Sequence, residues 1–228
     1  MPYFYYDWTM ILVIPGLLLG LYAQFKVKST FARYSRVRTK SGLTAEAAAR
    51  MLLSRGGSTN VTISRVNGSL TDHYDPSSKT LRLSDSVYGS DSVAAVGVAA
   101  HECGHALQEH DGYGLLKLRT ALVPVVNIGS SLYLPIFMAG LLFSWEPLQM
   151  VGILCFGLTL LFSLVTLPVE INASKRALGM LEGVLDAEEL QGAKAVLSAA
   201  ALTYLASVIS SALQLLRLIL ISRSRNRD

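Results

Sequence analysis

Long apolar stretches without charge alternate with polar segments along this chain and predict several membrane-spanning helices. Residues 8–25, 121–143 and 148–167 contain no Asp, Glu, Lys or Arg. At about 1.5 Å per helical residue, each stretch is close to or above the roughly 30 Å hydrocarbon thickness of a bilayer. A fourth apolar stretch, 196–222, contains Arg217. Its length favours a crossing, and the alternative is a bent or interfacial helix whose arginines reach the headgroups.

The polar region after the first span begins with a predicted helix over residues 43–55. Thr44 is the expected N-cap, and Gly56–Gly57 ends the helix. Three strand-like segments follow, separated by turn signals at Asn67–Gly68 and at residues 75–78. This pattern predicts a small antiparallel β-meander that packs on the next helix.

A second helix is expected to begin near Ser90 or Asp91, either of which could cap it, and to run to about Gln108. Valine and alanine flank its centre, so the helix is expected to be buried. Residues 101–105 of this helix read H-E-x-x-H, and they contain two of the four histidines of the chain. Two ordinary histidines and a surface glutamate are the alternative, but such groups are rarely buried without a partner.

The spacing of this motif suits a zinc hydrolase. Helical residues four apart lie on one face, so His101 and His105 can bind one ion. Glu102 lies about 100° further around the helix, where its carboxylate can take a proton from a metal-activated water. Cys103 is conceivable as a further ligand, but it points away from the histidine face and is expected to be a small buried residue.

The composition agrees with a membrane protein, because 51% of the residues are hydrophobic and only 16% are charged, against about 25% charged in soluble domains. The net charge of +4 is not arranged as a basic patch with interleaved aromatics, so nucleic acid is not an expected partner. The flank after the first span, residues 26–40, is basic and has no acid. This flank, and with it the H-E-x-x-H helix, is therefore predicted to be cytoplasmic.

Two histidines at a catalytic zinc need a third protein ligand. Glu170 has the best context, because it directly follows the predicted transmembrane hairpin 121–167. A carboxylate at the membrane edge is costly unless it has a partner. Asp111 is too close in sequence to His105, and Asp85 and Asp91, in the approach to the zinc helix, are poorer choices.

Two segments of the sequence resemble a known family. The resemblance is carried by HECGHALQ at residues 101–108 and LPVEINASKRA at residues 167–177. These segments are similar to the bacterial YugP-type neutral zinc metallopeptidases and, more distantly, to HtpX-type and prenyl-protein (CAAX) membrane peptidases. The resemblance covers nearly the whole chain. It implies a zinc peptidase of the bacterial plasma membrane, with His101, His105 and Glu170 as Zn²⁺ ligands and Glu102 as general base.

Three further residues are candidates around the metal. Ser174 stands where HtpX-type enzymes have an aspartate that supports a histidine, and a hydroxyl is expected to be a poor substitute. Asn172 or a backbone carbonyl is then the expected support. His73, on the middle predicted strand, could stabilise an oxyanion, although a solvent-facing histidine is the simpler interpretation.

The predicted fold is a mainly α membrane protein with a zincin-like H-E-x-x-H helix, a small β-meander and three to four transmembrane helices. Its predicted parts are an anchor (1–25), a cytoplasmic peptidase core (26–120), a transmembrane hairpin (121–167), a third-ligand helix (168–195) and a C-terminal apolar helix with a basic tail (196–228).

The expected partners are the lipid bilayer and a peptide or protein substrate. A catalytically silent zinc-binding adaptor or sensor is the main alternative. A transporter is disfavoured, because transport sites lie near the membrane midplane whereas these polar groups lie outside the spans.

Overall fold

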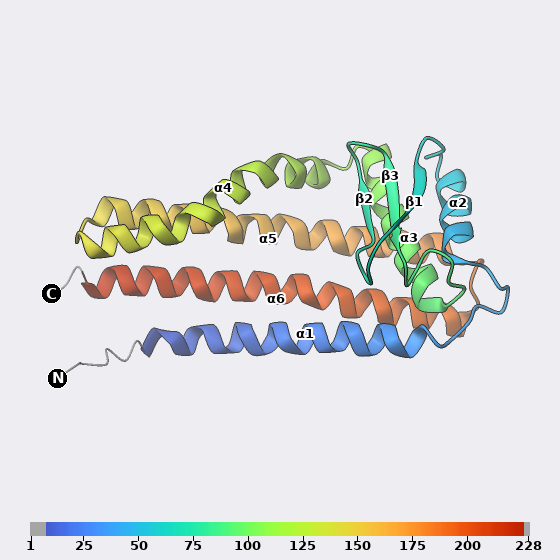
Figure 1. Cartoon of the computed structure of the whole chain (residues 1–228), viewed down its shortest axis with the longest axis horizontal. Coiled ribbons are helices and arrows are strands. Elements are labelled where there is room, and N and C mark those ends of the chain that lie inside the picture. Colours follow the sequence, from blue (N-terminus) through green and yellow to red (C-terminus); the bar gives the residue numbers. More distant parts are fainter. Residues whose placement is uncertain (1–7, 226–228) are drawn as a thin grey trace. The chain divides into compact units, whose positions relative to one another are not determined.

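The computed structural model describes residues 8–225, and helices dominate it (Figure 1). In chain order the elements are η1 (Trp8–Leu12), α1 (Val13–Tyr34), α2 (Ala45–Arg55), β1 (Thr62–Val66), β2 (His73–Asp75), β3 (Thr80–Ser84), α3 (Val93–His110), α4 (Gly114–Leu142), α5 (Glu146–Leu181) and α6 (Ala187–Arg225). The described chain divides into two compact units. The first unit consists of residues 8–22, 118–167 and 203–225, and the second unit consists of residues 23–117 and 168–202. The mainly α fold with a small β element is confirmed.

Four helical segments are long and apolar enough to cross a membrane. They are Trp8–Tyr34, Gly114–Leu142, Glu146–Leu181 and Ala187–Ser224. The three predicted spans and the fourth apolar stretch each coincide with one of these candidate helices. In the first unit, Arg217 Nε donates to Thr9 Oγ1 at 3.2 Å. A polar partner makes an arginine in such a helix less costly.

The segment that carries Glu170 is not a separate helix. Residues 168–181 continue α5 through Pro168, because proline removes one helical hydrogen bond without ending every helix that contains it. The chain then turns, and α6 begins at Ala187 after Asp186, whose carboxylate accepts from the backbone N–H groups of Glu188 and Glu189. Helix α5 therefore ends at Leu181, whereas the sequence predicted a new helix from residue 168. Helix α6 begins at Ala187, whereas the sequence predicted a start at residue 196.

The sheet is mixed, and the predicted antiparallel meander is wrong. β3 is the central strand, with β1 parallel to it on one side and β2 antiparallel on the other. The segment after β1 does not close a hairpin, because it is tied to the end of β3. Gly68, at φ +112°, donates its N–H to Asp85 and accepts from the Asp85 N–H. Asp72 accepts from the backbone N–H and the hydroxyl of Ser84. β2 therefore starts on the far side of β3.

Capping residues fix the ends of the two short helices of the second unit. Thr44 accepts from the Ala47 N–H and caps α2, as predicted. Ser92, rather than Ser90 or Asp91, caps α3 and accepts from the Ala95 N–H. Ser90 instead donates its hydroxyl to Ser92, so it supports the cap from outside the helix.

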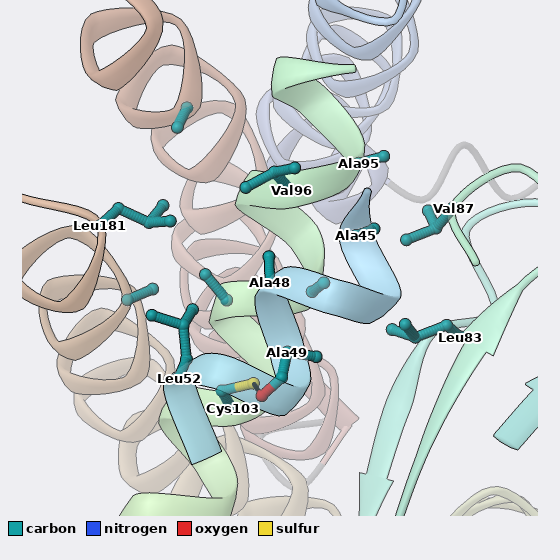
Figure 2. Packing of buried hydrophobic residues seen from close by; sticks show 14 of the residues in the cluster. Ala45, Ala48, Ala49, Leu52, Leu83, Val87, Ala95, Val96, Cys103 and Leu181 are labelled. Carbon is teal, nitrogen blue, oxygen red and sulfur yellow. Dashed lines mark hydrogen bonds between the residues drawn. The ribbon is translucent and has the colours of Figure 1, made fainter. Parts of the chain in front are cut away.

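Small side chains let α2 and α3 pack closely together, and this contact forms the core of the second unit (Figure 2). The buried residues of α2 are Ala45, Ala48, Ala49, Leu52 and Leu53. Cys103 of α3 points toward these residues, and its thiol lies 3.7 Å from the Ala49 carbonyl oxygen. The core therefore fixes the orientation of α3, whose opposite side carries the histidines.

Candidate metal centre

Three candidate ligands meet in the second unit. The Nε2 atoms of His101 and His105 lie 3.2 and 3.4 Å from the same oxygen, Oε2, of Glu170. The histidines are one turn apart on α3, whereas Glu170 comes from α5. The two imidazole rings are edge-to-face, with centroids 4.8 Å apart and planes at 83°. The three residues together form a group that could hold a metal ion.

The electrostatics of this group favour positive charge. Glu170 is 2% exposed, and His105 is 8% exposed. Burial alone would lower the pKa of His105, but the hydrogen bond with Glu170 and the negative charges of Glu102 and Glu170 raise it above its ordinary value. Carboxylates that stabilise a protonated imidazole also stabilise a cation bound in its place, with release of the proton.

The donor set fits zinc. Two imidazole nitrogens and one carboxylate oxygen are a common set of three protein ligands in catalytic zinc sites, where a fourth position is left for water or substrate. Each imidazole also has a hydrogen-bonding partner at its other nitrogen, as expected for ligands that must hold one orientation. The chemistry of these residues therefore agrees with a resident Zn²⁺ ion.

The residues that contact the Nδ1 atoms of the two histidines differ from those expected from the sequence. Ser174 Oγ lies 3.1 Å from His101 Nδ1, so this hydroxyl does contact the imidazole for which it was expected to be a poor support. Gln108, which sequence reasoning missed, places its Oε1 3.0 Å from His105 Nδ1. Asn172 contacts Gln108 rather than a histidine. The position of Gln108, three residues after His105 and so on the same face of α3, was the available signal.

Glu102 lies on α3 directly after His101 and is 8% exposed. Its charge is one of the causes that raise the pKa of His105. Across residues 8–225, the Glu102 side chain makes no hydrogen bond with another residue. A buried carboxylate without a hydrogen bond is costly, so the position of Glu102 beside the two histidines favours a role toward water or substrate.

The other candidates lie apart from the cluster. His73 on β2 is exposed, and its ring nitrogens contact the Thr71 carbonyl oxygen and Arg82. Cys103 is fully buried in the core, and burial raises the pKa of its thiol, which opposes a thiolate ligand. The three disfavoured aspartates form ion pairs elsewhere: Asp85 with Arg65, Asp91 with Arg38 and Asp111 with Arg176.

Helices α3 and α5 are in close contact where Gly104 faces Ala173. A Cβ atom added at Gly104 would lie 2.5 Å from the Ala173 carbonyl oxygen, a backbone atom that cannot easily move. Gly104 is inside the H-E-x-x-H motif, and Ala173 is three residues after Glu170. The absence of a side chain at position 104 therefore allows the third ligand to reach the histidines.

Gly104→Ala is expected to destabilise the protein by about 1–3 kcal/mol through overpacking, which lowers Tm by about 2–4 °C per kcal/mol for a chain of this size. The matched control is Gly179→Ala on α5, where an added Cβ meets nothing within 4 Å. That change should be neutral or stabilise by about 0.5–1 kcal/mol, because alanine favours a helix over glycine. Thermal unfolding of both metal-free variants checks this, and an equal Tm for the two would refute the close-approach argument.

Comparisons with known proteins cover nearly the whole chain. A family model described as "Putative neutral zinc metallopeptidase" matches residues 9–223. The chain is 45% identical over 214 residues to "Putative membrane protease YugP" of Bacillus subtilis (strain 168), and the match covers 93% of this chain and 95% of that protein. No solved structure shows a significant match. The matched range includes both histidines, Glu102 and Glu170.

Proposed function

The chain belongs to the family described as "Putative neutral zinc metallopeptidase", and from this premise we propose that it is a membrane-bound zinc endopeptidase. His101, His105 and Glu170 hold the Zn²⁺ ion, and Glu102 is the general base. The observation that carries the proposal is the convergence of two imidazole Nε2 atoms on one oxygen of Glu170, at 3.2 and 3.4 Å.

The chemistry divides between the ion and the side chains of the chain. Bound zinc would polarise the substrate carbonyl and make a coordinated water more acidic. Glu102 accepts a proton from the attacking water at its carboxylate and later donates it to the leaving amine nitrogen. Burial keeps this carboxylate away from bulk solvent. Ser174 Oγ and Gln108 Oε1 contact the other ring nitrogens of the two imidazoles.

We also place this site on the cytoplasmic side of a bacterial cell membrane. Residues 26–40 follow the uncharged stretch 8–25, contain six basic residues and no acid, and belong to the same compact unit as the histidines. Short flanks rich in lysine and arginine remain cytoplasmic. Substrates are then peptides or proteins that reach this face, and we infer that damaged membrane proteins are among them because Glu170 closely follows an apolar segment of α5.

Hydrolysis of casein by membrane vesicles tests both the proposed reaction and the side of the membrane on which the site lies. Inverted vesicles that contain the full-length protein should cleave added casein, and right-side-out vesicles should not. The chelator 1,10-phenanthroline should abolish cleavage and added zinc should restore it, whereas the non-chelating isomer 1,7-phenanthroline should have no effect. Cleavage that survives metal removal would contradict a zinc peptidase, and cleavage only by right-side-out vesicles would contradict the cytoplasmic side.

A further inference from the structure

A chain of polar side chains runs behind His105, on the side away from Glu170. Gln108 Oε1 lies 3.0 Å from His105 Nδ1. Gln108 Nε2 donates to Asn172 Oδ1 at 2.9 Å, and Arg176 Nε donates to the same oxygen at 2.9 Å. Arg176 Nη1 also donates to Asp111 at the end of α3. The chain therefore joins the two helices that carry the proposed ligands.

The backbone of α5 determines which way the Gln108 amide faces. Gln108 Nε2 lies 2.8 Å from the carbonyl oxygen of Val169, which can only accept a hydrogen bond. The NH₂ group must therefore face Val169, and the Oε1 atom must face His105. An oxygen there requires the His105 Nδ1 atom to carry a proton and to donate it. The neutral imidazole then presents the Nε2 lone pair toward Glu170 and the proposed ion.

The orientation of the Asn172 amide also follows from its hydrogen-bonding partners. Its Oδ1 atom receives two donors, Gln108 Nε2 and Arg176 Nε. A guanidinium has no acceptor atom, so oxygen rather than nitrogen must face Arg176. Both hydrogens of the Gln108 NH₂ group thus have acceptors, one on Val169 and one on Asn172.

Gln108 is fully buried, and an amide in such a place needs all its partners, because each unsatisfied group costs stability. An apolar side chain of similar size would fill the same space without this requirement. A fully satisfied amide in contact with His105 presents its oxygen to the imidazole in one fixed direction. We propose that Gln108 and Asn172 are positioning residues, which hold His105 in the tautomer and orientation that bind the metal.

This inference rests on the proposed function, in that it takes His105 to bind zinc. Its test is the dissociation constant for zinc of the purified full-length protein, measured by competition with a chromophoric chelator. Gln108→Met fills similar space without a hydrogen bond and should weaken zinc binding by about 10–100-fold, the usual effect of losing an outer partner of a ligand. The visible spectrum of the Co²⁺-loaded variant should also change. Gln191→Met, an exposed change in the same unit, should alter neither.

A pair of changes at Asn172 separates orientation from packing. Asn172→Asp keeps an acceptor for both donors and should retain the zinc affinity of the parent. Asn172→Leu removes the acceptor and should weaken zinc binding several-fold. If Gln108→Met does not fold, this pair decides alone, and equal zinc affinities for the two Asn172 variants would overturn the proposal. Where Gln108→Met folds, a dissociation constant and Co²⁺ spectrum identical to those of the parent would overturn it as well.

These outcomes are distinct from failure of the proposed function. A parent protein that binds zinc but does not hydrolyse peptides would refute the peptidase and leave the positioning role intact. A parent protein that hydrolyses peptides, with variants of unchanged zinc affinity, would refute only the positioning role. A parent protein that binds no zinc would refute both.

Discussion

Replacing Glu102 by glutamine should reduce peptide hydrolysis by about 10²–10⁴-fold, the usual contribution of general acid–base catalysis. Glutamine has nearly the same shape as glutamate but cannot accept a proton at neutral pH. No residue in the described part of the chain is hydrogen-bonded to the Glu102 side chain, so the change should leave the surrounding structure intact. Zinc content should stay at the parental level, because the proposed ligands are unchanged.

The measurement is the initial rate of casein hydrolysis together with the zinc content of each purified protein. Glu109→Gln is the matched control, because Glu109 lies on the same helix and its carboxylate accepts a hydrogen bond from the Tyr74 hydroxyl. Glutamine at position 109 can still accept that hydrogen bond, so this variant should keep the activity of the parent. A Glu102→Gln variant that hydrolyses casein as fast as the parent would refute the role of Glu102 as general base. A parent without any turnover would favour a silent zinc-binding adaptor or sensor.

The part of the site that lies on one helix follows from local geometry. The spacing of His101 and His105 places both imidazoles on one face of any α-helix, whatever surrounds it. The third proposed ligand was reached differently, from the cost of leaving Glu170 without a partner beside an apolar stretch. The structure brings these three residues together. Helix caps such as Thr44 were also predictable, because a cap depends on residues close in sequence.

Features that depend on distant contacts were not predictable from the sequence. Asn67–Gly68 is a strong hairpin signal, but the contacts of Gly68 with Asp85 and of Asp72 with Ser84 overrode it and produced a mixed sheet. These contacts join residues 12 or more positions apart, so no local pattern reveals them. The strand pairing around Asn67–Gly68 therefore depends on contacts with the end of β3 as well as on the turn residues themselves.

The support of the two histidines shows the same limit. Ser174 was expected to be a poor substitute for an aspartate, but its Oγ atom lies 3.1 Å from His101 Nδ1. Gln108 supports His105 only because Val169 and Asn172, on another helix, orient its amide. A sequence shows that a glutamine lies on the ligand face, but only the packing of α3 against α5 shows which atom it presents.

Glu170→Gln should weaken zinc binding by more than about 100-fold. Loss of an outer partner alone costs about 10–100-fold, and this change removes the negative charge of a proposed ligand itself. Glutamine keeps the size of the side chain, so the contact between α3 and α5 should persist. Zinc would then be held by His101 and His105 without the carboxylate on which they converge.

Equilibrium zinc affinity, measured by chelator competition, tests most directly whether these three side chains form one metal site. The comparison is among the parent, Glu170→Gln and Glu182→Gln, an exposed carboxylate just beyond the end of α5. The parent and Glu182→Gln should bind zinc equally well, and Glu170→Gln should bind it more than about 100-fold more weakly. Equal affinity of Glu170→Gln and the parent would contradict the metal centre described above.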